Sequence, residues 1–362
     1  MFIKEKLHFT DKVLFIVHLA IGDFTYLQNC FKKLKDRYPT LKIDLFIQDV
    51  RMTDDEAKWE GLKNYILYEW VQETGLFHKI YYGYSPQVHA QSILECKNEQ
   101  YPYVISLGDL RSQNYSLLAR EIAQNNIALG INIKTHLFSF AAKKALKSLD
   151  FKIKDLTDKS AHISEKFAYW FEQFADITFT KDDRYPFIHI PEIWDEKALE
   201  YLLKHQWDRN SPIVFINIFA KGDERCWSLE EATTLIKKLK NTEQYANAIF
   251  ILNSLPEDLT HLETEILKNA LSSTFVFSAQ LSFFELPALL KRCDLIITVD
   301  TSIMHLATFS SGKLISLLRK NRKKPSPRWL PLKKEQSIII YTEGLGAPIA
   351  SISAEEVLDK IV

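Results

Sequence analysis

The sequence predicts an α/β protein with two domains, each built around a parallel sheet, and three observations support this. The chain has 362 residues, whereas one ordinary domain takes about 100 to 200. Short apolar runs alternate with longer amphipathic stretches, as in strand–helix–strand units. Residues 181–198, with two prolines and mixed charge, interrupt this pattern. We therefore predict domains over 1–185 and 186–340, followed by a helical segment over 341–362.

Apolar runs in both halves predict the strands of these sheets. In the first half they cover 13–19, 42–48 and 103–108. In the second half they cover 213–219, 248–254, 274–278, 294–300 and 313–318. The first helix is expected from Phe24 to about Tyr38, and another near 115–124. Ser228 and Glu231 predict a capping box, and residues 351–362 predict a short capped helix.

Composition excludes several classes of protein. The 46 Lys and Arg residues equal the 46 Asp and Glu residues, so no global field attracts nucleic acid or an anionic membrane. The four cysteines are scattered without a CxxC pair, which argues against a zinc knuckle and favours a reducing compartment. The N-terminus is charged, and no stretch approaches the ~18 apolar residues of a membrane span. We expect a cytoplasmic protein.

The loops that follow the predicted strands are the candidate binding sites, because ligands bind at the carboxyl ends of parallel strands. In the first loop, residues 18–24, Gly22 permits a tight turn and Asp23 stands just before a helix. Asp23 is either an ordinary helix-capping acid or a general base at the mouth of a cleft.

The second loop, residues 220–227, brings cations to the end of a buried strand. Lys221 and Arg225 suit a diphosphate, and Arg can hold phosphate oxygens in a bidentate fork. Asp223 and Glu224 offer the alternative of a solvated turn in which these acids pair with the same cations.

The third loop is the most specific of the three. Asp300 ends an apolar strand, and Thr301 and Ser302 begin a helix at once, which leaves free N–H groups for a phosphate. Asp300 would repel a phosphate placed directly on it, so we expect it to accept hydrogen bonds from sugar hydroxyls. His305 lies one turn into the helix. The structural alternative is a capping acid and a packed histidine.

Together these loops resemble the motifs of glycosyltransferase family 9, the ADP-heptose:lipopolysaccharide heptosyltransferases. That family has Gly-Asp after its first strand, a Lys- or Arg-bearing loop that ends in Trp, and Asp-Thr-Gly-x-x-His-Leu-Ala near its C-terminus. Corresponding segments occur here in the same order, at 21–23, 225–227 and 300–307. The similarity is strongest from about 211 to 318 and thin between about 50 and 200.

The resemblance implies a GT-B fold, with two Rossmann-like domains facing each other across a cleft, and an inverting transfer without metal or cofactor. Asp23, on the turn at Gly22, would deprotonate the acceptor hydroxyl. The implied donor-binding residues are Lys221, Arg225, Asp300, Thr301, Ser302 and His305. The implied donor is ADP-heptose, bound by the second domain. The implied acceptor, bound by the first, is a hydroxyl of the lipid-linked lipopolysaccharide or lipooligosaccharide inner core, at the cytoplasmic face of the inner membrane.

The sequence departs from the family at two places. Ser302 replaces the usual glycine, and the common Gly-Pro-Thr-Asp segment after the last strand is replaced by a basic run at 319–328 followed by Trp329. The run is either a contact with anionic lipid or core phosphates or a solvated turn. These departures leave another nucleotide sugar, such as a hexose or N-acetylhexosamine donor, as the alternative.

Other functions fit less well. No GxGxxG or GxxxxGK[ST] follows a predicted strand, which argues against a dinucleotide dehydrogenase and a P-loop enzyme. No HExxH suggests a zinc hydrolase, and we expect no nucleic-acid partner. A non-catalytic binder of nucleotide sugars would not need Asp23. The aromatic side chains of residues 59–84 either pack or shape an acceptor groove, with packing favoured.

Overall fold

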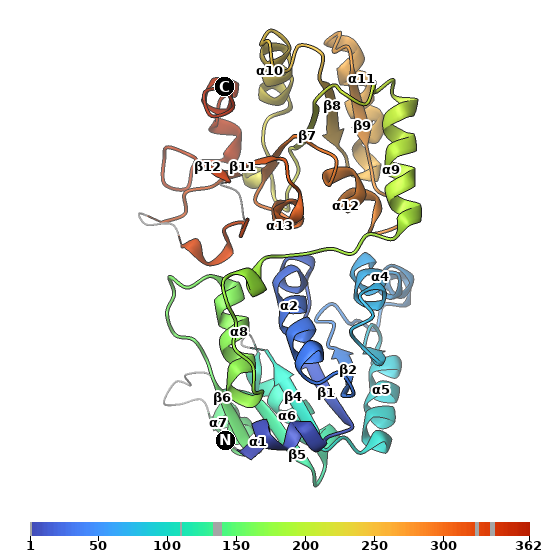
Figure 1. The fold of residues 1–362 in the computed structure, drawn as a ribbon, viewed down its shortest axis with the longest axis vertical. Helices are drawn as coiled ribbons and strands as arrows, with labels where there is room; N and C mark the ends of the chain where they lie inside the picture. Colours follow the sequence, from blue (N-terminus) through green and yellow to red (C-terminus); the bar gives the residue numbers. More distant parts are fainter. Residues whose placement is uncertain (1, 109–110, 133–139, 323–325, 334–336) are drawn as a thin grey trace. The chain divides into compact units, whose positions relative to one another are not determined.

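The computed structural model describes residues 2–108, 111–132, 140–322, 326–333 and 337–362. It divides into two compact units, Met1–Arg184 and Tyr185–Val362 (Figure 1). The division falls inside the segment 181–198. Residues 341–362, which we expected as a separate segment, belong to the second unit. The prediction of an α/β protein with two parallel-sheet domains is confirmed.

The first unit contains a six-stranded parallel sheet in the order β3-β2-β1-β4-β5-β6. Its strands are β1 (Lys12–Val17), β2 (Lys42–Ile47), β3 (Lys79–Tyr82), β4 (Tyr103–Leu107), β5 (Ile127–Asn132) and β6 (Phe151–Lys154). Successive side chains of a strand point to opposite faces of its sheet. Leu14 and Ile16 of β1 accordingly join the cluster that includes side chains of α5 and α6, whereas Phe15 stacks on Phe171 of α8.

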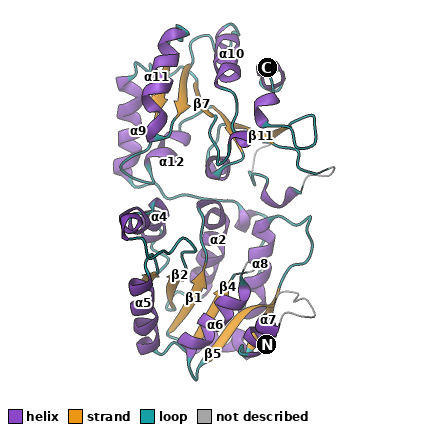
Figure 2. Cartoon of the chain, turned by 180° about the vertical axis from the view of Figure 1, so that it is seen from behind, coloured by secondary structure: helices purple, strands orange, loops and turns teal. Residues whose placement is uncertain are grey.

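Helices therefore cover both faces of this sheet, with α5 and α6 on the face turned toward the viewer in Figure 2. The helices of the first unit are α1 (Phe2–Lys6), α2 (Ile21–Arg37), α3 (Trp59–Lys63), α4 (Ile66–Glu73), α5 (Pro86–Glu99), α6 (Ser112–Ala123), α7 (Phe140–Lys147) and α8 (Ile163–Phe174).

The second unit repeats the architecture, with strand order β12-β11-β10-β7-β8-β9. Its strands are β7 (Ile213–Asn217), β8 (Ile249–Asn253), β9 (Thr274–Phe277), β10 (Leu295–Val299), β11 (Lys313–Leu318) and β12 (Ile338–Tyr341). Its helices are α9 (Glu192–Lys204), α10 (Leu229–Lys240), α11 (Leu259–Lys268), α12 (Glu285–Leu290), α13 (Ser302–Leu306) and α14 (Ala354–Leu358). Numbered within each unit, the strands have the same spatial order, so the two sheets share one topology.

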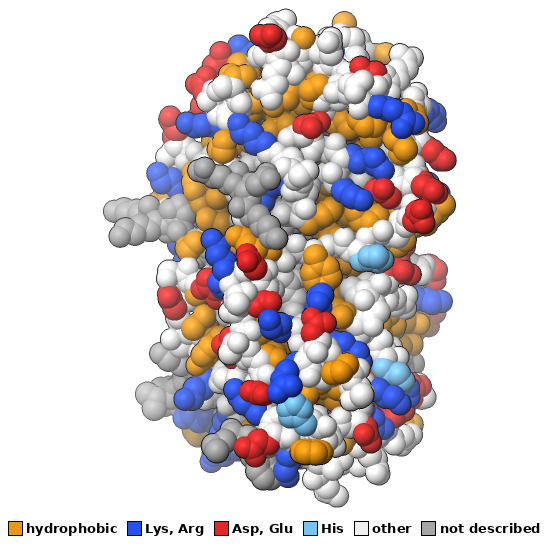
Figure 3. Space-filling model, in the orientation of Figure 1, with side chains coloured by type: hydrophobic (Ala, Val, Ile, Leu, Met, Phe, Trp, Pro, Cys, Tyr) orange, Lys and Arg blue, Asp and Glu red, His pale blue; other side chains and the backbone are white. Residues whose placement is uncertain are grey.

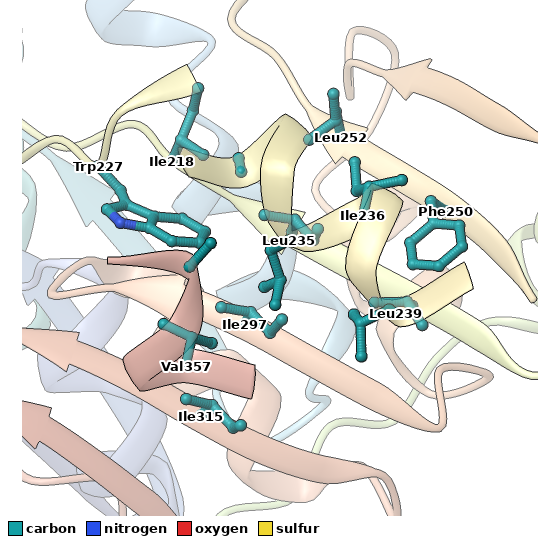
Figure 4. Packing of buried hydrophobic residues seen from close by; sticks show 14 of the residues in the cluster. Ile218, Trp227, Leu235, Ile236, Leu239, Phe250, Leu252, Ile297, Ile315 and Val357 are labelled. Carbon is teal, nitrogen blue, oxygen red and sulfur yellow. The ribbon is translucent and has the colours of Figure 1, made fainter. Parts of the chain in front are cut away.

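The core of the second unit lies between the sheet and the helices α10 and α14. Leu235 and Leu239 of α10 and Val357 of α14 pack on strand residues such as Ile297, as Figure 4 shows. Trp227, at the end of the second predicted loop, belongs to the same cluster.

Two local expectations differ from the structure. The first long helix, α2, begins at Ile21 rather than Phe24, so Gly22 lies inside its first turn and makes no separate turn before it. At α10, the Ser228 hydroxyl accepts from the Glu231 N–H as predicted (3.3 Å). The Glu231 carboxylate, however, accepts from the backbone N–H of Ala354, because the C-terminal segment supplies a donor that displaces the reciprocal bond of a capping box.

Charged side chains of both signs are interspersed on the face drawn in Figure 3, in keeping with the balance of 46 basic and 46 acidic residues. Among the described residues, no helix is both long enough and apolar enough to cross a bilayer.

Candidate functional site

The second and third predicted loops flank the reversal point of the second sheet, where the strand order reverses between β7 and β10. β7 and β10 are neighbours, but the chain continues from β7 to β8 on one side and from β10 to β11 on the other. The connections after these strands run in opposite directions, and sheets of this type usually bind their ligand at such a point. The loop 220–227 follows β7, and Asp300 follows β10.

Arg225 and Asp300 form an ion pair across this reversal point. The guanidinium Nη2 donates to Asp300 Oδ2 at 2.7 Å and to the Asp300 carbonyl oxygen at 3.0 Å. Both side chains are a little under two-fifths exposed, so solvent reaches the pair and a ligand can compete for either partner. The solvated-turn alternative, with Arg225 paired to its neighbouring acids, does not describe this loop.

The loop that carries Arg225 is held at both ends. The backbone N–H of Trp227 donates to the Ile218 carbonyl at 2.9 Å, and the N–H of Ala220 donates to Cys226 Sγ at 3.3 Å. Gly222 has a φ of +99°, a conformation that side-chain-bearing residues rarely adopt. These hydrogen bonds and the backbone conformation at Gly222 fix the position of the Arg225 backbone.

A buried polar network beneath the reversal point was not predicted from the sequence. Asn217, at the end of β7, donates to Thr298 Oγ1 (3.1 Å) and Thr301 Oγ1 (3.4 Å). Its own side-chain oxygen accepts from the amide of Asn253, at the end of β8, at 3.0 Å. The signal in the sequence that could have indicated this network is Asn217, a polar residue at the end of an otherwise apolar strand. The network orients Thr301, one of the predicted donor-binding residues.

The residues after Asp300 form a short helix. Thr301 precedes it, Ser302 is its first residue, and both are half-buried. His305 is buried, at 6% exposure, and its ring meets the indole of Trp329 edge to face, with centroids 5.8 Å apart. With five residues, α13 has only a small dipole to offer an anion, so the side chains around it must supply most of the charge.

The remaining cations of this region divide into two groups. Lys221 is exposed. Arg319, the first residue of the basic run, donates to the carbonyls of Gly346 and Ala347 and lies 3.4 Å from a Glu224 carboxylate oxygen. Arg319 thus ties β11 to the C-terminal segment and is not a freely solvated charge. Residues 323–325 of the run lie outside the described part of the chain.

Asp23 lies in the first turn of α2, directly beyond β1. Its carboxylate accepts from the N–H of Ala20 at 3.2 Å, so it does cap the helix, from the third helical position. The side chain is half-buried. In this sheet β1 and β4 occupy the reversal point, so Asp23 stands where ligands meet such folds. Capping and a role as base are compatible, because a carboxylate accepts several hydrogen bonds.

A second cluster in the first unit was missed, although it also follows a strand. The Asp49 carboxylate, buried after β2, accepts from Arg51 Nε (2.9 Å), Arg51 Nη2 (2.6 Å) and the Tyr68 hydroxyl (3.0 Å). Burial opposes ionisation of Asp49, but the hydrogen bonds from Arg51 prevail and lower its pKa. Arg51 lies over the Tyr65 ring at 3.9 Å. Burial, with the charges of Asp49 and Asp23, raises the pKa of Tyr65.

Asp49 also borders a pocket of about 420 Å³. The pocket is lined by Gln48, Asp49, Val50, Met52, His89, Ile93, Arg111, Asn114, Tyr115, Leu117, Leu118 and Glu121. Within the described part of the chain, no group of three or more His, Cys, Asp or Glu side chains is placed to hold a metal ion.

The family model of glycosyltransferase family 9 (heptosyltransferase) matches residues 127–351, which is more than half of the chain. This chain belongs to glycosyltransferase family 9. The resemblance drawn from the three motifs is therefore confirmed, and the chain is a glycosyltransferase. Arg225, Asp300 and His305 lie inside the matched range, whereas Asp23 lies outside it. No curated protein sequence matches the chain.

Solved structures of a family 9 glycosyl transferase and of two heptosyltransferases share the fold of this chain. The family 9 glycosyl transferase from Veillonella parvula is 16% identical, with a TM-score of 0.73 over 96% of this chain and 95% of that one. The ADP-heptose LPS heptosyltransferase II of E. coli is 17% identical (TM-score 0.65, 97% of both chains). An E. coli heptosyltransferase with ADP-2-deoxy-2-fluoro heptose is 13% identical (TM-score 0.64, 97% and 98%). At these identities the likeness establishes the fold alone.

Proposed function

We propose that this family 9 glycosyltransferase moves heptose from ADP-heptose to a hydroxyl of a lipopolysaccharide or lipooligosaccharide inner core, with inversion at the sugar carbon and without a metal. The observation that carries the proposal is the Arg225–Asp300 pair at the reversal point of the second sheet. Arg225 supplies a cation for the leaving diphosphate, and Asp300 supplies a carboxylate for the sugar hydroxyls. The family to which the chain belongs is described as heptosyltransferase.

On the donor side, the diphosphate draws the Arg225 guanidinium away from the Asp300 carboxylate. Arg225, helped by the exposed Lys221, neutralises the charge that develops as the bond between sugar and phosphate breaks. Asp300 is then free to accept hydrogen bonds from the sugar. Thr301, held by Asn217, and Ser302 donate to phosphate oxygens, and His305 supports the turn that carries them.

On the acceptor side, Asp23 is the general base. The acceptor oxygen attacks the sugar carbon as the diphosphate leaves, and the hydroxyl proton passes to the Asp23 carboxylate. Positioned bases of this kind contribute about 10²- to 10⁴-fold to a rate. Because Arg225 stabilises the negative charge of the leaving diphosphate, no divalent ion is needed for this purpose.

The proposed acceptor is linked to lipid, so the enzyme would meet it at the cytoplasmic face of the inner membrane. Besides Lys320, the exposed Arg322 is a described cation of the basic run that we assign to contact with an anionic surface. Arg319 is committed to backbone carbonyls. Nucleic acid is not among the proposed partners.

The test is a calorimetric titration of the purified protein with ADP, UDP and GDP, each with and without EDTA. It is followed by transfer of heptose from ADP-heptose to lipopolysaccharide truncated before the heptoses. Selective binding of ADP that survives EDTA, together with transfer, is expected. Preference for UDP or GDP would retain the glycosyltransferase and replace the donor. Binding without transfer to any acceptor would favour a nucleotide-sugar-binding relative.

A further inference from the structure

Helix α7 and strand β6 of the first unit carry a concentration of positive charge, at the lower left of Figure 1, in a chain without net charge. The lysines of residues 140–154 are Lys143, Lys144, Lys147, Lys152 and Lys154. The one acid of this segment, Asp150, is paired with Arg120 of α6. The next acid along the chain, Asp155, is paired with Lys166. The positive charge of this segment is therefore not neutralised by its own acids.

Helix α7 has an apolar inner face and a basic outer face. Ala145 and Leu146 are buried, and Leu146 joins the cluster that includes side chains of α5 and α6. Phe140, Lys144 and Lys147 are exposed, and their spacing of four and three residues places them on one side of the helix. Within the described part of the chain, neither Lys144 nor Lys147 forms an ion pair.

The lysines of β6 lie on the same face of the sheet as α7. Ala128 of β5 packs in the cluster with α6 and α7, so Gly130 and Asn132, which alternate with the residues between them, share that face. In the parallel register Gly130 pairs with Lys152 and Asn132 with Lys154. Both lysines are exposed, and neither forms an ion pair with another described residue. Residues of the helix and of the edge strand thus contribute to one basic surface.

Phe140 adds an apolar group to this surface. Its side chain is 77% exposed, and an aromatic ring left in water costs free energy. A polyanion in solution would bind the lysines but would not remove this ring from water. A bilayer of anionic lipids does both, because its phosphates attract lysines and its headgroup region takes up aromatic rings.

We propose that the first unit docks on a bilayer of anionic phospholipids through this surface, with the Phe140 ring entering the headgroup region. We call it the α7–β6 surface, and it consists of Phe140, Lys144, Lys147, Lys152 and Lys154. It belongs to a different unit from the basic run after β11. The inference goes beyond the proposed function and does not depend on the donor, although a lipid-linked acceptor would make such docking useful.

The experiment is co-sedimentation of the full chain with vesicles. One set is made of equal parts of phosphatidylcholine and phosphatidylglycerol, and the other of phosphatidylcholine alone. The wild-type protein should bind the anionic set only, and more weakly as salt is added. Lys144→Gln combined with Lys147→Gln should lower the partition coefficient about 10- to 30-fold, at about 5-fold for each lysine near an anionic surface. Lys152→Gln combined with Lys154→Gln should have a similar effect.

Two further variants separate docking from general charge effects. Phe140→Ala should weaken binding roughly 10-fold and leave its salt dependence unchanged, because the ring contributes through burial and not through charge. Lys42→Gln combined with Lys63→Gln is the matched control. It removes two exposed lysines of the same unit that form no ion pair with a described residue, and it should have little effect. Circular dichroism checks that each variant is folded.

Every other result contradicts the proposal. Absence of binding to anionic vesicles overturns it, as does an equal loss in the control pair, which would assign the effect to net charge. A loss confined to Lys320→Gln combined with Arg322→Gln would place the membrane contact on the basic run. An unchanged affinity in Phe140→Ala, with soluble polyphosphate competing fully, would show a site for anions in solution. Because vesicle binding needs no nucleotide sugar, failure of the heptose proposal would leave this one standing.

Discussion

The indole N–H of Trp227 donates to the backbone carbonyl of Ile352 at 2.8 Å. Both residues are buried, at 3% and 1% exposure. Trp227 closes the loop that bears Arg225, and Ile352 lies in the segment that follows β12. A buried tryptophan with its N–H satisfied therefore fastens the proposed phosphate loop to the end of the chain.

Replacing Trp227 should destabilise the second unit. Trp227→Phe leaves the buried Ile352 carbonyl without its donor and should cost about 1 to 3 kcal/mol in the free energy of unfolding. Trp227→Ala adds a cavity and should cost about 3 to 5 kcal/mol. Urea denaturation followed by circular dichroism measures both. Trp194→Phe serves as the control, and an equal loss in that variant would contradict a specific role for the Trp227 bond.

The Arg225–Asp300 pair predicts opposite effects of its two truncations on ADP binding. Arg225→Ala removes a charge-assisted contact and should weaken binding about 10- to 100-fold. Asp300→Ala frees the guanidinium, still held by the residue 300 carbonyl, and should bind ADP at least as tightly as wild type while transfer is lost. Calorimetry measures the affinities, with the exposed Lys268→Ala as control. Parallel losses in the two truncations would show that the pair acts as a unit in folding.

Asp23 should affect transfer and not donor binding. Asp23→Asn keeps an oxygen that can accept from the Ala20 N–H but cannot take a proton, so transfer should fall about 10²- to 10⁴-fold. ADP affinity, which we assign to the second unit, should stay at the wild-type value. Asp23→Ala should abolish transfer and also lose about 0.5 to 2 kcal/mol of helix capping. Transfer by Asp23→Asn at the wild-type rate would exclude this carboxylate as the base.

Glu99 predicts an acid-sensitive contribution to the first unit. The Glu99 carboxylate accepts hydrogen bonds from the ammonium groups of Lys12, at 2.7 Å, and Lys79. These two bonds lower the pKa of Glu99 to about 2. A lowered pKa stabilises the fold above the unfolded value, near 4.5, and this stabilisation is lost as the pH falls toward 2. Glu99→Gln should cost about 1 kcal/mol at pH 7, since solvent screens these part-exposed charges.

The cost of Glu99→Gln should shrink through that acid window, as urea denaturation at several pH values would measure. Glu121→Gln removes an exposed carboxylate paired with Lys97 and should change the stability by less than about 0.5 kcal/mol. A cost of Glu99→Gln that is the same at pH 7 and pH 2.5 would show that its charge is irrelevant.

Sequence patterns identified the inner strands of both sheets except β5, because burial leaves a simple signal. All five residues of β7, β8 and β10 are buried, and each strand is apolar except for one residue, Asn217, Asn253 or Thr298. β3 and β6 are edge strands with one buried residue each. Their alternation with polar residues resembles that of loops, and both were missed, as was the edge strand β12, which also has one buried residue. The aromatic region 59–84 packs in part: Trp70, for example, is buried against Phe24.

Site residues could be predicted where a polar or charged residue follows the end of a strand. They could not be predicted where their role depends on contact with a residue that is distant in the sequence. The motif supplied Arg225 and Asp300 separately, but 75 residues separate them, and nothing in the sequence indicated their ion pair. Asn217 was not singled out because it closes an apolar strand. Asp49 was not singled out because neither its burial nor its bond to Tyr68 is visible in the sequence.

The contribution of the C-terminal segment to the second core bears on how the protein is made. Ile349, Ile352, Val357 and Ile361 all belong to that core. On the ribosome, domains fold as they emerge, N-terminal first. The first unit has every strand of its sheet once residue 154 is made. The second unit, in contrast, lacks the core residues of its C-terminal segment until about residue 361. Between the completion of β11 at residue 318 and that of the C-terminal segment, α10 is in place but the contacts of α14 with this core are still missing. The nascent chain is then exposed to aggregation and to chaperones.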